Sequence, residues 1–161
     1  MERLLLISSL IFVFMACGEV TTETDPSPSP SESSPVWTAV VLGADFSDPT
    51  GTLNTISLDE SWTVSTNLQV THSDAVVRSF GGLVYVVNRL GGDNIQVVDP
   101  ADFSVVNQFS TGAGTNPQEI RVVRRDLGYV TLYQPEENRS GDLEVDDLLV
   151  VNPETGEILK T

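Results

Sequence analysis

The sequence has little of several residue types that usually reveal what a protein does. Its 161 residues include one cysteine, Cys17, and one histidine, His72. A single cysteine cannot form an internal disulfide framework. Lys and Arg number 8 against 23 Asp and Glu, so the formal net charge is -15. A surface this acidic repels phosphate backbones and anionic headgroups, which argues against nucleic-acid partners and against electrostatic docking to a membrane.

Long hydrophobic runs are also scarce. The one near the start, Leu4 to Phe14, is too short to span a bilayer as a stable helix. It follows a short segment containing Arg3, and a small residue and the only cysteine, Ala16-Cys17, come soon after it. This order is typical of a secretory signal peptide.

The end of this segment resembles a bacterial lipobox, although Phe14 and Met15 replace the Leu and the small residue usual before Ala-Cys. The resemblance implies that Cys17 is linked to diacylglycerol, acylated, and becomes the mature N-terminus. Gly18 in place of Asp favours the outer membrane or cell surface. The alternatives are a plain secretory signal with an incidental cysteine, or a short anchor helix. Acyl chains bury many methylenes at about 0.8 kcal/mol each, which suffices for stable anchoring.

The composition predicts three segments. Residues 1–16 form the lipoprotein signal peptide. Residues 17–35 contain the lipidated Cys17 and a tether in which Pro and Ser alternate. Such a tether favours extended conformations and holds the folded part away from the membrane. Residues 36–161 form the folded region.

The folded region is all-β in its pattern. Short runs rich in Val, Ile, Leu, Thr and Tyr alternate with turn residues, and helical periodicity is absent. The expected strands are Trp37–Leu42, Asn54–Leu58, Trp62–Val70, Ala75–Ser79, Leu83–Asn88, Ile95–Val98, Ser104–Phe109, Glu119–Val123, Gly128–Tyr133, Leu148–Val151 and Glu157–Lys160.

Two of these strands carry a repeat. Tyr85-Val86-Val87-Asn88 and Tyr129-Val130-Thr131-Leu132 lie 44 residues apart, a period that suits one four-stranded propeller blade. The same offset predicts that Val41 is equivalent to the two tyrosines. It also makes Asp74 equivalent to Gln118, and Arg78 equivalent to Val122. A further correspondence is predicted for three strand ends, Leu58-Asp59, Val98-Asp99 and Val151-Asn152.

The order of motifs resembles the YVTN family of β-propeller repeats. An apolar strand at 85–88 is followed by a glycine turn at 91–94, a strand ending in Asp99, and a closing strand that leads into Gly114-Thr115-Asn116-Pro117. The resemblance implies about three four-stranded antiparallel blades of a larger propeller. Because closed propellers typically have four to eight blades, we expect this chain to be the N-terminal part of a longer protein. A closed assembly of several copies is the alternative.

Catalytic groups are not evident. His72-Ser73-Asp74 contains the residue types of a nucleophilic triad, but consecutive strand residues point to opposite faces, so a loop-to-strand junction is the preferred interpretation. The acidic insertion 135–146 offers Asp142, Glu144 and Asp146 as a weak calcium site, because Ca²⁺ prefers several oxygen ligands on a flexible loop. A solvated acidic hairpin is the simpler interpretation. No cofactor is expected.

The remaining candidates are aromatic and cationic. Trp62 and Phe103 follow Asp59 and Asp99 at equivalent places, and we expect them, like Trp37, to pack between blades rather than to bind ligand. The arginines could face a central opening, and ion pairs with the acidic excess are the preferred interpretation for them; they are Arg89, Arg121, Arg124 and Arg125.

These observations favour a lipid-anchored binding or scaffold module of the cell envelope, whose partner is an unknown protein or small ligand. A lactonase-like, metal-dependent hydrolase is one alternative implied by the resemblance, and a structural surface-layer protein is another. The sequence does not supply the convergent His and carboxylate groups that the hydrolase would need.

Overall fold

Strands and turns account for the structure of this chain. The computed structural model describes residues 38–45, 47–133 and 147–161, all within the unit Pro35–Thr161, and no helix occurs among them. The all-β prediction is therefore confirmed. The strands are β1 (Thr38–Ala44), β2 (Thr50–Ser57), β3 (Val64–His72), β4 (Ala75–Phe80), β5 (Leu83–Asn88), β6 (Asn94–Val98), β7 (Val105–Ser110), β8 (Pro117–Arg124), β9 (Leu127–Leu132), β10 (Leu148–Asn152) and β11 (Glu157–Lys160).

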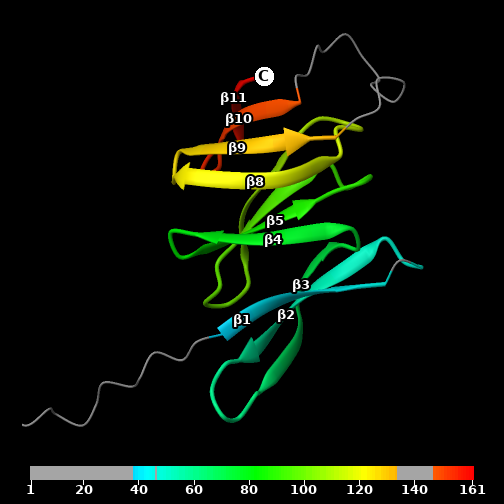
Figure 1. Ribbon diagram of the computed structural model, residues 1–161, viewed down its shortest axis with the longest axis vertical. Helices are drawn as coiled ribbons and strands as arrows, with labels where there is room; N and C mark the ends of the chain where they lie inside the picture. The colour runs from blue at the N-terminus through cyan, green and yellow to red at the C-terminus, as the bar shows by residue number, and fades with distance from the viewer. Residues whose placement is uncertain (1–37, 46, 134–146) are drawn as a thin grey trace, which may run out of the picture. The chain divides into compact units, whose positions relative to one another are not determined.

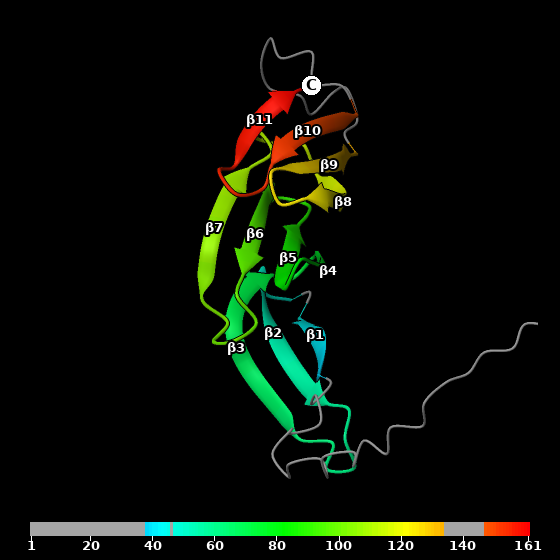
Figure 2. The ribbon, with the colours of Figure 1, turned by 90° about the vertical axis from the view of Figure 1, so that its left-hand side faces the viewer.

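The strands form three antiparallel sheets, and within each sheet neighbouring strands are consecutive in the sequence. The first sheet is β1-β2-β3, the second β4-β5-β6-β7 and the third β8-β9-β10-β11 (Figures 1 and 2). This up-and-down order is that of propeller blades. Four strands were expected in each sheet, and the first has three among the described residues.

The second sheet is covered on both faces, which explains its nearly continuous apolar sequence. Along β5, Tyr85 and Val87 belong to a buried cluster shared with the third sheet. Val84 and Val86 belong to a second cluster shared with the first sheet. Successive strand residues point to opposite faces, so β5 supplies both interfaces at once.

The repeat predicted from the tyrosines is confirmed. Tyr85 lies opposite Arg78 of β4 and Val97 of β6. Tyr129 lies opposite Arg121 of β8 and Val150 of β10. Each tyrosine is thus on the second strand of its sheet. The next residue of β9, Val130, packs toward the second sheet, so Tyr129 points away from it, just as Tyr85 points away from the first.

The prediction that Val41 is equivalent to these tyrosines is wrong by one residue. Its neighbours Val40 and Leu42 pack against the second sheet, so Val41 points away from it. Leu42 pairs with Leu53 as Tyr85 pairs with Val97. The cause is the β1–β2 connection, which between these equivalent pairs is one residue shorter than the β5–β6 connection. A one-residue slip moves every side chain of a strand to the other face.

The predicted matches of Arg78 with Val122 and of Asp74 with Gln118 are also wrong. The ladder between β8 and β9 is irregular between Pro117 and Glu119. A second β-bulge, between Val122 and Arg124, places Arg121, not Val122, opposite the tyrosine. The residue that matches Asp74 is Asn116, because the carbonyl of each accepts a hydrogen bond from the residue that follows the second strand. The amide of Arg89 donates to the Asp74 carbonyl, and the amide of Tyr133 donates to the Asn116 carbonyl.

The predicted correspondence of the strand ends is confirmed for Asp99 and Asn152 but not for Asp59. The amides of Trp62, Phe103 and Gly156 bond the carbonyls of Asp59, Asp99 and Asn152, at 3.3, 2.8 and 2.8 Å. All three donors have positive φ, at 48°, 61° and 77°. The second and third repeats therefore share one turn, in which the donor follows the acceptor by four residues. In the first repeat Trp62 follows Asp59 by only three residues, and the hairpin closes between Ser57 and Thr63. Asp and Asn suit the first position of these turns because their side chains bond nearby backbone amides.

Strand boundaries differ from expectation by a few residues, most in β2. The predicted strand Asn54–Leu58 begins earlier, at Thr50, and includes Gly51. A Cβ on Gly51 would lie 2.7 Å from the carbonyl oxygen of His72. This glycine therefore permits close pairing of β2 with β3 rather than marking a turn.

We expect Gly156→Ala to destabilise the folded region more than Gly91→Ala. Both glycines have positive φ, so either substitution strains the backbone by about 1–3 kcal/mol. A Cβ at Gly156 would also lie 2.6 Å from Cβ of Phe109, whereas one at Gly91 would meet nothing within 4 Å. Urea unfolding of the two variants should differ by about 1–3 kcal/mol, the usual cost of overpacking. Equal losses would contradict the contact between the second and third sheets at this turn.

Candidate functional site

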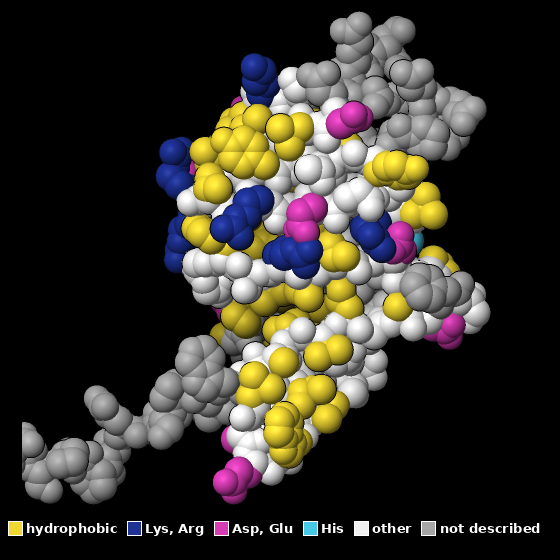
Figure 3. Space-filling model, in the orientation of Figure 1, with side chains coloured by type: hydrophobic (Ala, Val, Ile, Leu, Met, Phe, Trp, Pro, Cys, Tyr) yellow, Lys and Arg dark blue, Asp and Glu magenta, His cyan; other side chains and the backbone are white. Residues whose placement is uncertain are grey.

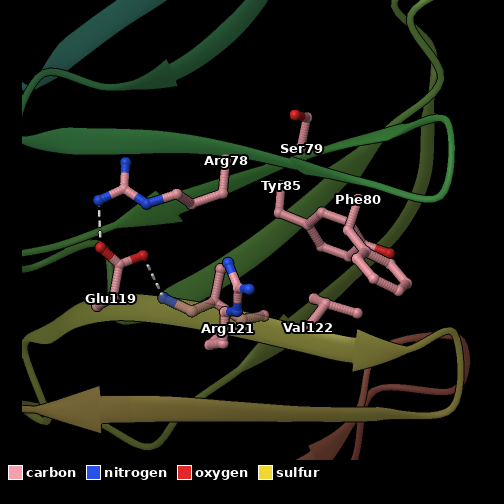
Figure 4. A pocket seen from close by; sticks show the side chains of 8 residues that line it. Arg78, Ser79, Phe80, Tyr85, Glu119, Arg121 and Val122 are labelled. Carbon is pink, nitrogen blue, oxygen red and sulfur yellow. Dashed lines mark hydrogen bonds and ion pairs between the residues drawn. The ribbon is translucent and has the colours of Figure 1, made fainter. Parts of the chain in front are cut away.

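A cavity of about 300 Å³ lies between the first strands of the second and third sheets (Figure 4). It opens between β4 and β8, which Figure 1 shows side by side. The residues that line it are Arg78, Ser79, Phe80, Tyr85, Glu119, Ile120, Arg121 and Val122. Of these residues, only Arg121 was among the candidates predicted from the sequence, as one of the arginines that could face a central opening.

Two arginines line this cavity. Arg78 and Arg121 occupy the same register position, each opposite the tyrosine of the next strand, and the bulge between Val122 and Arg124 brings Arg121 there. Arg78 shares the face of Tyr85 toward the third sheet, whereas Arg121 shares the outer face of the third sheet with Tyr129. Because β8 is the edge strand of its sheet, Arg121 nevertheless lines the cavity.

The two arginines differ in their partners. Arg78 forms an ion pair with Glu119, whose other carboxylate oxygen accepts a hydrogen bond from the Ile120 amide at 3.0 Å. Arg121 is exposed, and its guanidinium forms no ion pair with any described residue. The pair with Glu119 is half exposed and contributes little to stability.

The floor of the cavity is apolar and aromatic. Phe80, Tyr85 and Val122 lie together beneath the arginines (Figure 4). Tyr85 is buried, and this burial raises the pKa of its hydroxyl above the ordinary value. The hydroxyl is therefore protonated at neutral pH. A cavity with an apolar floor and a few polar groups at its rim is typical of small-molecule binding sites.

The other arginines of this region are held by neighbours. Arg89 donates to the Asp74 carboxylate at 3.0 Å, and Arg125 donates to the Gly81 carbonyl at 3.4 Å. Arg124 lies 2.9 Å from Asp126, and this contact raises the arginine pKa and lowers the aspartate pKa. The preference for ion pairs is thus confirmed for Arg89 and Arg124, whereas Arg121 lacks one among the described residues.

His72, Ser73 and Asp74 do not form a triad. The His72 ring bonds the backbone of Asp74, with Nδ1 3.1 Å from the amide nitrogen. The Asp74 carboxylate binds Arg89 instead. His72 ends β3 and Ala75 begins β4, so the interpretation as a junction between two strands is confirmed.

The expectation that three aromatic residues pack between blades holds for one of them and not for another. Phe103 packs against the buried cluster between the first and second sheets, as predicted. Trp62 was expected to pack likewise, but it is 63% exposed. Trp37 lies outside the described residues.

Metal binding and membrane insertion receive no support from the described residues. No group of three or more His, Cys, Asp or Glu side chains there is close enough to hold a metal ion. The weak calcium candidates Asp142, Glu144 and Asp146 lie outside those residues, as does Cys17. Within the same ranges, no helix has the length and apolar character needed to cross a bilayer.

No protein-family model matches this chain, and no curated protein matches it in sequence. The class of protein is therefore defined by its fold. It is an all-β protein of repeated, stacked antiparallel sheets of the propeller-blade type, with an arginine-lined cavity between two first strands.

Proposed function

We propose that this chain is a lipid-anchored binding module of the cell envelope that holds an anionic ligand at the arginine-lined cavity. The observation that carries the proposal is the exposed guanidinium of Arg121, which has no ion-pair partner among the described residues and stands beside Arg78. In a chain of net charge -15, cations left without carboxylates are scarce.

The distribution of charge supports this site. The described cations are Arg78, Arg89, Arg121, Arg124, Arg125 and Lys160. Four of them lie on β4, on β8 or in the turn after β8, and Arg89, in the turn after β5, donates to Asp74 directly before β4. Figure 3 shows the Lys and Arg side chains gathered across this face of the molecule. Such a local field attracts anions even when the whole protein is acidic.

The chemistry of the ligand follows from the side chains. A guanidinium presents a planar fork of donors that suits a carboxylate or a phosphate. Phe80 and Val122 offer apolar contact below it. The ligand class is therefore a small organic anion, free or presented on an envelope protein. Nucleic acid is disfavoured by the overall acidity.

The proposed location in the cell envelope rests on the sequence. The apolar run Leu4–Phe14, the following Ala16-Cys17 and the Pro/Ser-rich tether support a lipid anchor that holds the folded region away from the membrane. A tethered module of this kind can present its cavity to molecules of the envelope. This part of the proposal is independent of the cavity.

We expect Arg121→Gln to weaken anion binding by roughly tenfold or more, because hydrogen bonds to charged groups contribute about 1.5–3 kcal/mol. Isothermal titration with citrate and with inorganic phosphate, at low ionic strength, measures this. Arg124→Gln is the matched control, since that guanidinium is occupied by Asp126. Equal affinity in both variants, or no saturable binding to the unmodified chain, would overturn the assignment of the cavity.

A further inference from the structure

Two exposed aromatic side chains mark the outer faces of the first and third sheets. Tyr129 of the third sheet is 37% exposed, and Trp62, in the turn after β2 of the first sheet, is 63% exposed. Neither side chain is covered by another described sheet. Each has an equivalent inside the chain that is covered, and these equivalents show what kind of surface fits it.

Tyr129 repeats the position of Tyr85. Tyr85 is 1% exposed because the third sheet packs over it. The face around Tyr129 continues in the same way, since Val150 lies directly opposite it and Leu148 lies opposite Thr131. Leu148 is itself exposed. The outer face of the third sheet therefore carries the side-chain types that, one repeat earlier, are buried by the next sheet.

Trp62 repeats the position of Phe103 and Gly156. Phe103 packs against the cluster between the first and second sheets. Gly156 lies against Phe109 of the second sheet. In both cases the position contacts the preceding sheet. Trp62 directly precedes Thr63, which closes its hairpin, just as Phe103 precedes Ser104, and it too has a positive φ. It is therefore the residue that would contact a sheet placed before the first.

The face around Trp62 is also apolar. Val41 takes the register position of Val84, which is buried at the first interface. On the same face, Ile56 pairs with Val64. Val41 and Val64 are 38% and 58% exposed. This face matches the side of the second sheet that receives the first.

We propose that the outer face of the third sheet, with Tyr129, binds the outer face of the first sheet, with Trp62, of a second copy of this chain. The contact would repeat between copies the kind of packing that the sheets already make within one copy. Such an interface is heterologous, or head-to-tail, because it joins two different faces. It continues a stack whose internal interfaces are already apolar.

Charge opposes this association at long range. Copies with a formal charge of -15 repel each other, and salt screens that repulsion. Association should therefore strengthen as salt is added, as expected for contact between apolar faces. An interface built on ion pairs would weaken instead, which would overturn the proposal.

The first test is photo-crosslinking in the full chain. A benzoylphenylalanine at position 129, in a mixture of isotopically labelled and unlabelled copies, should link to the peptide that contains Trp62 and Val64 of another copy. Mass spectrometry identifies such links by their mixed isotope content. Links only within one copy, or to peptides away from the first sheet, would contradict the proposal.

The second test uses complementary variants. Tyr129→Glu and Trp62→Asn each remove one face, and Asn tolerates the positive φ at position 62. Each variant alone should lose assembly by about tenfold or more, as is usual when a central aromatic is removed. Their equimolar mixture should form dimers, since one intact face of each kind remains.

The control is Leu90→Glu, which changes a side chain that is 65% exposed in a turn of the second sheet. It should assemble like the unmodified chain in sedimentation velocity. Circular dichroism checks that every variant keeps its strands. An unmodified chain that stays monomeric, single variants that still assemble, or a mixture that stays monomeric would each overturn the proposal.

Discussion

Val130→Asp is expected to abolish cooperative folding of the second and third sheets. Val130 is fully buried in the cluster shared by those sheets. A carboxylate there would have no partner, and burying an unpaired charge costs several kcal/mol or more. Domains are stable by only about 5–15 kcal/mol. Urea unfolding followed by circular dichroism should show a broad transition or none.

The matched control is Thr131→Asp, one residue further along β9. Thr131 is exposed, and its side chain points to the opposite face. This variant should unfold within about 0.5 kcal/mol of the unmodified chain, as surface changes usually do. If the two variants lost similar stability, β9 would not present alternate residues to the second sheet, and the stacking described above would be wrong.

The second large effect concerns the anchor. Cys17→Ala should abolish labelling by a fatty-acid analogue, because the proposed lipid bonds require the thiol. Loss of the acyl chains removes about 0.8 kcal/mol for each methylene buried in the bilayer. The chain should then move from the membrane fraction to the soluble fraction after signal cleavage. Metabolic labelling and fractionation of the expressing bacterium measure both effects.

Gly18→Ala serves as the control, since it keeps the cysteine and every residue before it. It should be labelled and membrane-bound like the unmodified chain. Equal labelling with and without Cys17 would remove the lipid anchor from the proposed function. It would leave the cavity proposal intact, because anion binding is measured on the folded region.

The class of fold could be predicted from the sequence because it depends on local patterns. Runs such as Leu83–Asn88 combine β-branched and aromatic residues between turn residues, so strands were foreseen there and in the right order. The equivalence of Tyr85 and Tyr129 could also be predicted, because the β4–β5 and β8–β9 turns have the same length. The repeated turn after Asp99 and Asn152 was visible for the same reason.

Register was harder to predict because it depends on single residues. A β1–β2 connection that is shorter by one residue moves Val41 to the outer face. One bulge in β8 brings Arg121 opposite Tyr129. Neither changes the hydrophobic pattern enough to be recognised in one sequence. The exposed Trp62 was missed for a related reason, since a pattern does not show which sheet covers a face.

The cavity could be anticipated only in part. The arginines were noted as a group, but their pairing depends on which carboxylates the folded chain brings near. Arg78 meets Glu119 from another sheet, 41 residues away in the sequence. Arg121 meets no carboxylate among the described residues. Which of these two arginines has a carboxylate partner depends on how β4 and β8 stack, and the sequence alone does not show this.

The nuclear Overhauser contacts of the two equivalent tyrosine rings test the stacking of repeated sheets most directly. The account predicts contacts from the Tyr85 ring to the methyl groups of Val122 in the third sheet, because both side chains belong to one buried cluster. It predicts that the Tyr129 ring contacts Val150 of its own sheet and no residue of the second sheet. Contacts from Tyr129 to Val87, or none from Tyr85 to the third sheet, would contradict it.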